Sequence, residues 1–150
     1  MKKVTRTLLL LATIILPHNI KRRILMIAFK WEIAPTAKIG LSLIDAKCVK
    51  LGPNSRLGHF SVVRNLNTLV LQENARIGQW NWITAARPLV GSDQSRGLLF
   101  LGGDSAITSR HYVDCSGSVR VGAFTTVAGV RSTILSHQID TSLSRQTALP

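Results

Sequence analysis

The sequence predicts an all-β domain, a parallel β-helix of hexapeptide repeats preceded by a short helical cap. Two observations support this prediction. Aliphatic residues recur at every sixth position over long stretches after Ile33, and glycine often follows the aliphatic residue. A helix repeats every 3.6 residues and a strand every two, so neither alone gives a period of six. A short strand followed by a sharp corner does, and three such sides make a coil of about 18 residues that pairs in parallel with the next coil.

The repeat runs in blocks separated by shifts of register or by a gap. Its aliphatic members are Ile33, Ile39, Leu51, Leu57, Val63 and Leu69, then Leu71, Ile77 and Ile83, then Leu101, Ile107, Val113 and Val119, and finally Val121 and Val127. Small residues stand four positions later, at Ala37, Ser55, Ser61, Ala75, Ser105, Gly117 and Thr125. We expect both sets to point into one narrow prism of about six coils, a stack whose ends need caps.

Residues 1–31 form a basic N-terminal segment before the β-helix of residues 32–150. Seven basic residues and no acid precede Glu32, in a chain of formal net charge +12. The apolar run from Leu8 to Leu16 is about half the length that crosses a bilayer, and no small-residue cleavage site follows it. Pro17 interrupts the pattern, so we expect two helices, over residues 4–16 and 19–30.

The second of these helices is amphipathic. Ile20, Ile24, Ile27 and Trp31 fall on one face at helical spacing, framed by lysines and arginines. This pattern is typical of a helix in the interface of an anionic membrane, and also of a helix that caps the end of the β-helix. Both interpretations stay open, and they are compatible.

Residues 84–97 lack the repeat and contain Pro88 and Gly91, so we expect a loop that leaves the stack. Trp80 and Trp82 stand just before this loop, at a predicted corner. They are too large for so thin a core, which favours contact with a neighbouring subunit or a ligand.

The repeats, the opening "LPHNIKRRILMIAFKWEIAPTAKIG" and the late "SHQID" resemble the bacterial hexapeptide-repeat acyltransferases. The similarity covers about residues 17–150 and is closest to sugar O-acetyltransferases of polysaccharide and lipid-linked glycan synthesis. The resemblance implies a left-handed β-helix, against the usual right-handed crossover rule. It also implies a homotrimer with active sites between subunits. The expected activity is transfer of acetyl from acetyl-CoA to a sugar hydroxyl, in the cytoplasm or at the inner face of the cytoplasmic membrane.

Acetyl transfer to a hydroxyl needs a general base, and a neutral imidazole suits that role near pH 7. His137 is the candidate, because the repeat predicts a break near Ile134 that would turn it outward, and the resemblance selects the same residue. Asp114 and Asp140 are both candidates to orient an imidazole. We assign Asp140 to the catalytic pair and Asp114 to substrate binding.

His111 and Trp82 are the other candidate substrate-binding residues, with a packed structural histidine as the alternative for His111. Arg131 and Arg120 are candidates to contact the phosphates of coenzyme A, with solvated corner charges as the alternative.

Other functions find little support. Cys48 and Cys115 make neither a disulfide framework nor a zinc motif, which favours a reducing compartment. A related β-helix family, the γ-class carbonic anhydrases, binds zinc between subunits. The histidines of this sequence lack the paired spacing of such a site, so we expect no metal. Phosphate-loop motifs are absent, and basic residues do not alternate with aromatic ones, so we expect no nucleic acid.

Relatives of this kind usually continue after a Leu-Pro such as Leu149-Pro150, with coils that help to hold the pantetheine arm. The sequence given stops there. A shortened, catalytically inactive structural or adaptor β-helix is therefore the alternative to an acetyltransferase.

Overall fold

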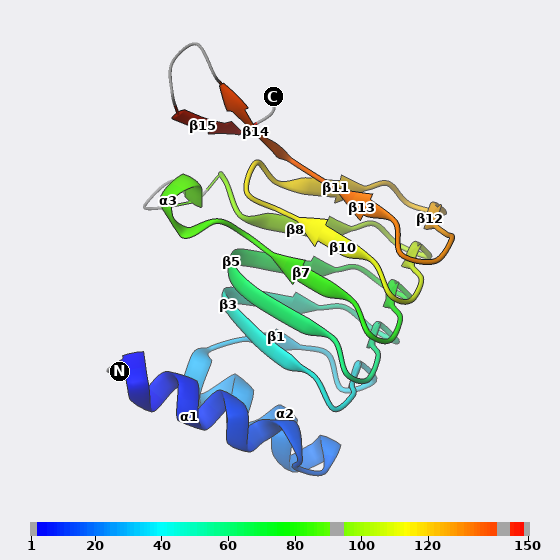
Figure 1. Cartoon of the computed structure of the whole chain (residues 1–150). Coiled ribbons are helices and arrows are strands. Elements are labelled where there is room, and N and C mark those ends of the chain that lie inside the picture. Colours follow the sequence, from blue (N-terminus) through cyan, green and yellow to red (C-terminus); the bar gives the residue numbers. More distant parts are fainter. Residues whose placement is uncertain (1–2, 91–94, 141–144, 149–150) are drawn as a thin grey trace.

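The computed structural model describes residues 3–90, 95–140 and 145–148. It is a left-handed parallel β-helix of about five turns with an N-terminal helical cap, so the predicted fold class is confirmed. In Figure 1 the chain crosses the near face toward α3, returns along the far face and climbs one level per turn, which is the left-handed sense. Among the described residues, no helix is long and apolar enough to cross a membrane.

Three faces of stacked parallel strands form the prism (Figure 1). The first face contains β1 (Glu32–Ile33), the second halves of β3 (Leu43–Leu51) and β5 (Val62–Leu71), β8 (Leu98–Leu101) and β11 (Val119–Val121). The second face contains β2 (Lys38–Ile39), β4 (Arg56–Leu57), β6 (Arg76–Ile77), β9 (Ala106–Ile107) and β12 (Thr126–Val127). The third face contains the first halves of β3 and β5, β7 (Trp82–Thr84), β10 (Tyr112–Asp114) and β13 (Thr133–Ile134).

The core is a set of aliphatic columns, one per face, because paired strands place equivalent residues directly above one another. On the second face the column is Ile39, Leu57, Ile77 and Ile107, all buried. Small residues fill the remaining interior, among them Ala37, Ser55, Ala75 and Ser105, as the repeat predicts. Val113 is also buried and Val127 is half-buried near the upper end, where it packs against the core.

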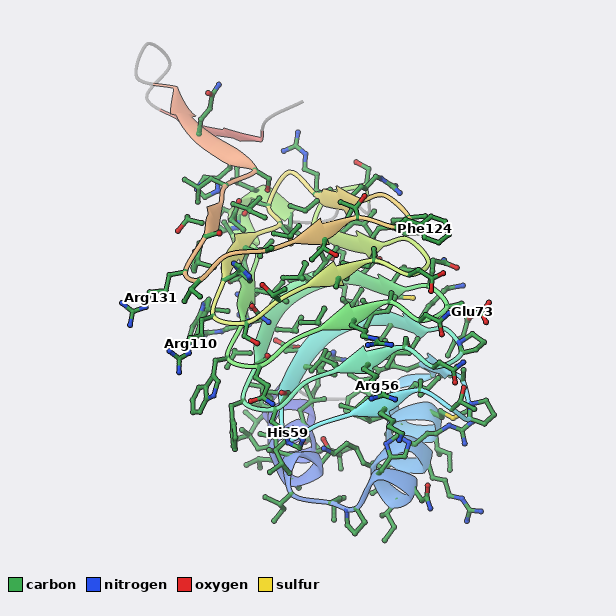
Figure 2. All side chains as sticks on the ribbon, turned by 90° about the vertical axis from the view of Figure 1, so that its right-hand side faces the viewer. Arg56, His59, Glu73, Arg110, Phe124 and Arg131 are labelled. Carbon is green, nitrogen blue, oxygen red and sulfur yellow. The ribbon has the colours of Figure 1, made fainter. Side chains whose placement is uncertain are left out.

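The corners require a left-handed backbone. Positive φ recurs at two edges: the arginine–aromatic edge of Phe60, Trp80, Arg110 and Arg131, and the asparagine edge of Asn54, Asn74, Asp104 and Phe124. Figure 2 views the second face between them, with Arg110 and Arg131 along one margin and Phe124 and Glu73 along the other. The remaining corner, between the third and first faces, is called the third edge below.

The stack has about five turns, fewer than the six predicted. Two departures from the predicted 18-residue coils account for the smaller number of turns. A coil of 18 residues separates the paired Ile39 and Leu57, but 20 separate Leu57 and Ile77. After β13 the chain leaves the stack as an antiparallel pair, β14 (His137–Asp140) and β15 (Arg145–Ala148). In the predicted loop over residues 84–97, α3 (Arg87–Val90) forms a single turn, and residues 91–94 lie outside the described part of the structure.

The cap consists of α1 (Lys3–Ile14) and α2 (His18–Phe29), separated at Pro17. Buried Lys21 joins them to the solenoid, since its Nζ donates to the carbonyl oxygens of Ile14 (2.9 Å) and Gly40 (2.8 Å). Burial lowers the pKa of Lys21. Trp31 does not share one face with Ile20 and Ile27, contrary to what the spacing predicts, because Trp31 is buried against Phe29 at a ring distance of 5.3 Å whereas both isoleucines are exposed.

We expect Gly58→Ala to destabilise the stack. An added Cβ would lie 2.6 Å from the carbonyl oxygen of Gly78, which is backbone of the next coil and cannot rotate away. Such overpacking costs about 1–3 kcal/mol of unfolding free energy, measurable by urea titration. Gly122→Ala is the matched control, because its Cβ would meet only Thr125 Oγ1, at 3.6 Å. Equal losses in the two variants would contradict this account.

Candidate active site

His137 and Asp114 form a hydrogen-bonded pair at the third edge. The Nδ1 of His137 lies 2.7 Å from Asp114 Oδ2. The side chain of Asp114 is 2% exposed, whereas that of His137 is 25% exposed. The carboxylate is therefore enclosed and the imidazole reaches solvent.

Two serines complete the surroundings of the carboxylate. Ser116 Oγ donates to Oδ1, and the backbone N–H of Ser136 donates to Oδ2 at 3.1 Å. Burial acts to raise the pKa of Asp114, but the hydrogen bonds from His137, Ser116 and Ser136 outweigh it, so the pKa lies below its ordinary value. Asp114 is thus an anion at neutral pH.

Strand register brings the pair together across 23 residues of sequence. β13 lies on β10, with Tyr112 opposite Thr133 and Val113 opposite Ile134. Asp114 is the last residue of β10, and the chain continues from β13 through Ser136 to His137, where it turns out of the stack. His137 therefore lies one level above the end of β10.

The loop that contains α3 is hydrogen-bonded to the residues that follow Asp114. The backbone N–H of Ala86 donates to Ser116 Oγ at 2.8 Å, and the N–H of Cys115 donates to the Thr84 carbonyl at 2.7 Å. Burial, and then the charge of Asp114, raise the pKa of the Cys115 thiol. Cys115 consequently stays protonated and is no nucleophile.

The arrangement fixes the tautomer of a neutral imidazole. Because Nδ1 faces an anionic acceptor, the proton of the neutral imidazole lies on Nδ1. This tautomer is assigned from the hydrogen-bond network. The lone pair is then on Nε2, which accepts no hydrogen bond from any residue in the described part of the chain. Such a group can remove a proton from a bound hydroxyl and return it to a leaving group.

A second group of predicted residues lines a hollow along the arginine–aromatic edge. This hollow has a volume of about 580 Å³, and its lining includes Trp82, His111 and Arg131. His111 is buried, and its Nε2 lies 2.7 Å from Thr108 Oγ1. Arg110 and Arg131 extend outward one above the other (Figure 2).

The hollow and the His137–Asp114 pair lie on the same outward side of the third face. Tyr112, which lines the hollow, and Asp114 are two residues apart on β10, so their side chains leave the strand in the same direction. The ordinary strand rise puts their Cα atoms about 7 Å apart. The hollow therefore lies at the arginine–aromatic end of the third face, and His137 lies at its other end, beside Asp114.

Two predicted residues lie elsewhere. Arg120 is on β11 of the first face, where its guanidinium lies 5.5 Å from the ring centre of Phe100. The backbone of Asp140 ends β14, while its side chain lies outside the described part of the structure. Arg120 thus lies on the first face, whereas Arg131 lies at the arginine–aromatic edge between the second and third faces.

Sequence reasoning missed Ser116 and Ser136. Their positions in the sequence could have indicated them, since each serine stands within two residues of a predicted site residue. Among the side chains described, no group of three or more His, Cys, Asp or Glu is placed to hold a metal ion.

Comparisons with protein-family models, with curated proteins and with solved structures found no match to this chain, which leaves the fold and the site geometry as the support for a function.

Proposed function

We propose that the protein is an O-acetyltransferase of the hexapeptide-repeat acyltransferase type, which moves acetyl from acetyl-CoA to a sugar hydroxyl. The observation that carries the proposal is the partly exposed His137, held by an anionic carboxylate through Nδ1. A β-helix that served only as a scaffold would have no need of an enclosed Asp114 carboxylate with several donors aimed at it.

The proposed reaction uses one base. Nε2 of His137 takes the proton of the sugar hydroxyl as its oxygen attacks the thioester carbonyl, and a C–O bond forms. The tetrahedral intermediate then collapses, the C–S bond breaks, and the imidazolium returns the proton to the coenzyme A thiolate. Asp114 stabilises the imidazolium between these steps and remains ionised throughout.

The hollow supplies groups of the right chemistry for both substrates. Trp82 and Tyr112 are exposed aromatic side chains, which suit the apolar face of a sugar ring. Arg110 and Arg131 suit the phosphates of coenzyme A. The acceptor sugar in this proposal belongs to a cell-surface polysaccharide or a lipid-linked glycan.

The test is direct. The full chain is incubated with acetyl-CoA and a panel of sugar acceptors, and thiol release and acetylated product are measured. We expect acceptor-dependent thiol release with one acetyl ester formed per thiol. Absence of transfer to every acceptor would favour the structural or adaptor alternative.

A homotrimer is part of the same proposal. Phe60 and Trp80 stack at 4.7 Å and are both exposed on the arginine–aromatic edge, an apolar surface that a second copy would cover. Sedimentation equilibrium should give three times the chain mass, and a monomer would contradict this part.

The proposed location is the inner face of the cytoplasmic membrane. The supporting surface is an apolar stripe of Val4, Leu8 and Leu11 on α1, continued by Ile15 just after the helix ends. These four residues are between 47% and 80% exposed. Ile20 and Ile27 of α2 are also exposed. The basic residues contribute less than their number suggests, since Lys21 is buried and Arg22 is bonded to the Ile33 carbonyl.

We expect Leu8→Ser with Ile15→Ser to weaken co-sedimentation with anionic vesicles by about tenfold or more, because two apolar side chains no longer enter the interface. Val130→Ser is the control, since Val130 is 70% exposed near the opposite end of the solenoid. Equal binding by the double variant and the control would contradict membrane docking through α1.

A further inference from the structure

The second face of the solenoid carries a column of cations, formed by Lys38, Arg56 and Arg76. They occupy equivalent positions of β2, β4 and β6, because the strand register pairs Lys38 with Arg56 and Arg56 with Arg76. The residue after each of them belongs to the buried aliphatic column of this face, so the three cations point outward, and all are exposed. Figure 2 views this face directly, with Arg56 on it.

The side chains of this cation column are unpaired. Within the described part of the chain, none of the three forms a hydrogen bond or an ion pair. Neighbouring strands lie about 4.8 Å apart, and like charges placed directly opposite each other on paired strands repel. The cation column therefore destabilises the free protein, and an anionic partner would relieve that repulsion.

Acidic residues do not neutralise the cation column. Glu32, Asp45 and Asp114 bond to basic residues off this face. Glu73 and Asp104 lie at the asparagine edge, which is the far margin of the face, and neither forms an ion pair with the column. The positive charge is consequently left for a partner from outside.

The positive potential extends beyond the cation column. Arg110 and Arg131 lie along the opposite margin of the face. At its foot, the pKa of His18 lies below its ordinary value, because of burial first and then of three neighbouring cations that include Lys38. A surface with excess charge of one sign concentrates counter-ions of the opposite sign, here anions.

The surface beside the cation column is low. The second residue after each cation is glycine, at Gly40, Gly58 and Gly78. In the two coils above, Ala106 and Thr126 stand in register with the column. These small residues leave room for an extended chain to approach the cations along their whole length.

The spacing of the cation column distinguishes between extended polymers. A peptide in the β conformation rises about 3.3 Å per residue, so its carboxylates on one side recur about every 6.6 Å and fall out of step with cations about 4.8 Å apart. One pyranose unit of an extended glycan is close in length to one strand spacing. A glycan with a carboxylate on successive sugars therefore repeats as the column does.

The neighbouring aromatic residues disfavour single-stranded nucleic acid. Proteins bind such strands by stacking the bases on free aromatic faces. On the arginine–aromatic edge, however, Phe60 already contacts the rings of His59 and Trp80, at 5.9 Å and 4.7 Å. The cations thus lack the free stacking platform that bases require.

We propose that the second face binds an acidic polysaccharide whose successive sugars carry carboxylates, with the glycan running along the cation column. Exposed ion pairs each contribute little, so several must act together, as a repeating ligand on a repeating surface allows. The surface is separate from the His137–Asp114 pair, and binding to it needs no acetyl transfer.

The experiment titrates the full chain with an oligomer of galacturonic acid at low ionic strength, where exposed charges are least screened, and follows the heat of binding. We expect saturable binding that the same oligomer with methyl-esterified carboxylates does not show. Arg56→Gln with Arg76→Gln should weaken binding by about fivefold to tenfold. The matched control is Arg64→Gln with Arg120→Gln, which removes the same charge from the third and first faces.

Melting temperatures measured alongside confirm that each variant is folded. Absence of binding, or equal binding of the esterified oligomer, would overturn the proposal. Equal losses in the two double variants would also overturn it, since net charge alone would then account for binding. A single-stranded oligonucleotide of the same charge that bound more tightly through Arg56 and Arg76 would assign the face to nucleic acid instead. Each outcome is independent of the acetyl-transfer assay.

Discussion

Replacing His137 with alanine is expected to lower kcat for acetyl transfer by about 10²- to 10⁴-fold, the usual contribution of a general base. Without Nε2 the attacking hydroxyl keeps its proton, and the coenzyme A thiolate must take its proton from water. The change removes one hydrogen bond from the enclosed Asp114 and should lower stability, but the chain should still fold, since His137 is partly exposed and follows the last strand of the stack. Thiol release measured with thermal unfolding of the same preparation distinguishes loss of chemistry from loss of structure.

His59→Ala is the control for this variant. His59 is exposed near the arginine–aromatic edge, where its Nδ1 accepts a hydrogen bond from the Leu41 N–H at 3.2 Å (Figure 2). We expect the acetyl-transfer rate to be unchanged by this substitution. Activity that survives His137→Ala, or that falls equally with His59→Ala, would remove His137 from the mechanism.

The fold was predictable because a period of six follows from the geometry of the backbone. Each coil must turn three corners, and each side has room for one large inward residue and one small one. Leu57 and Ser55 occupy these two interior roles two positions apart in the second coil, and both are buried. The left-handed sense came from the resemblance, because nothing in the period selects it.

The candidate site was only partly predictable, since coil length decides which residues meet. Counting six from Val127 gives Thr133, but the inward residue of that side is Ile134, which pairs with Val113 across a coil of 21 residues. A fixed period could not predict that lengthening. The partner of His137 is therefore Asp114, one coil below, which the sequence named as a candidate alongside Asp140 but which we had assigned to substrate binding.

The sequence also could not show which of the N-terminal basic residues lie at the surface. Charge counting treats Lys21 and Arg23 alike. Lys21 is buried, however, and joins two backbone carbonyls, whereas Arg23 is exposed. The apolar stripe of α1 is regular in sequence, but its exposure depends on which face of the helix packs against the solenoid.

Asp114→Asn tests the other member of the pair. The amide keeps the shape of the carboxylate but loses its charge, so it neither stabilises the imidazolium nor enforces the proton on Nδ1. We expect kcat for acetyl transfer to fall by about 10²- to 10⁴-fold, as in other histidine–carboxylate pairs. Asp104→Asn is the control, because the exposed Asp104 bonds Asn74 at 2.9 Å on the asparagine edge.

The effect of Asp114→Asn on the free energy of unfolding should also depend on pH. The pKa of folded Asp114 lies below its ordinary value, so the folded state favours the charged form. This stabilisation is complete above the unfolded pKa, near 4, and is lost as pH falls through the lower folded pKa. The wild type should exceed Asp114→Asn in unfolding free energy by about 1–3 kcal/mol at pH 7, the usual cost of losing hydrogen bonds to a buried charged group.

Urea unfolding of both proteins between pH 7 and pH 3 measures this difference, which should shrink steadily below about pH 4 as Asp114 takes up a proton in the wild type. A difference that stays constant with pH would mean that the carboxylate charge contributes nothing and that the loss arises from packing alone. Since the proposed mechanism requires an anionic Asp114 beside His137, that result would count against the mechanism as well as against the electrostatic account.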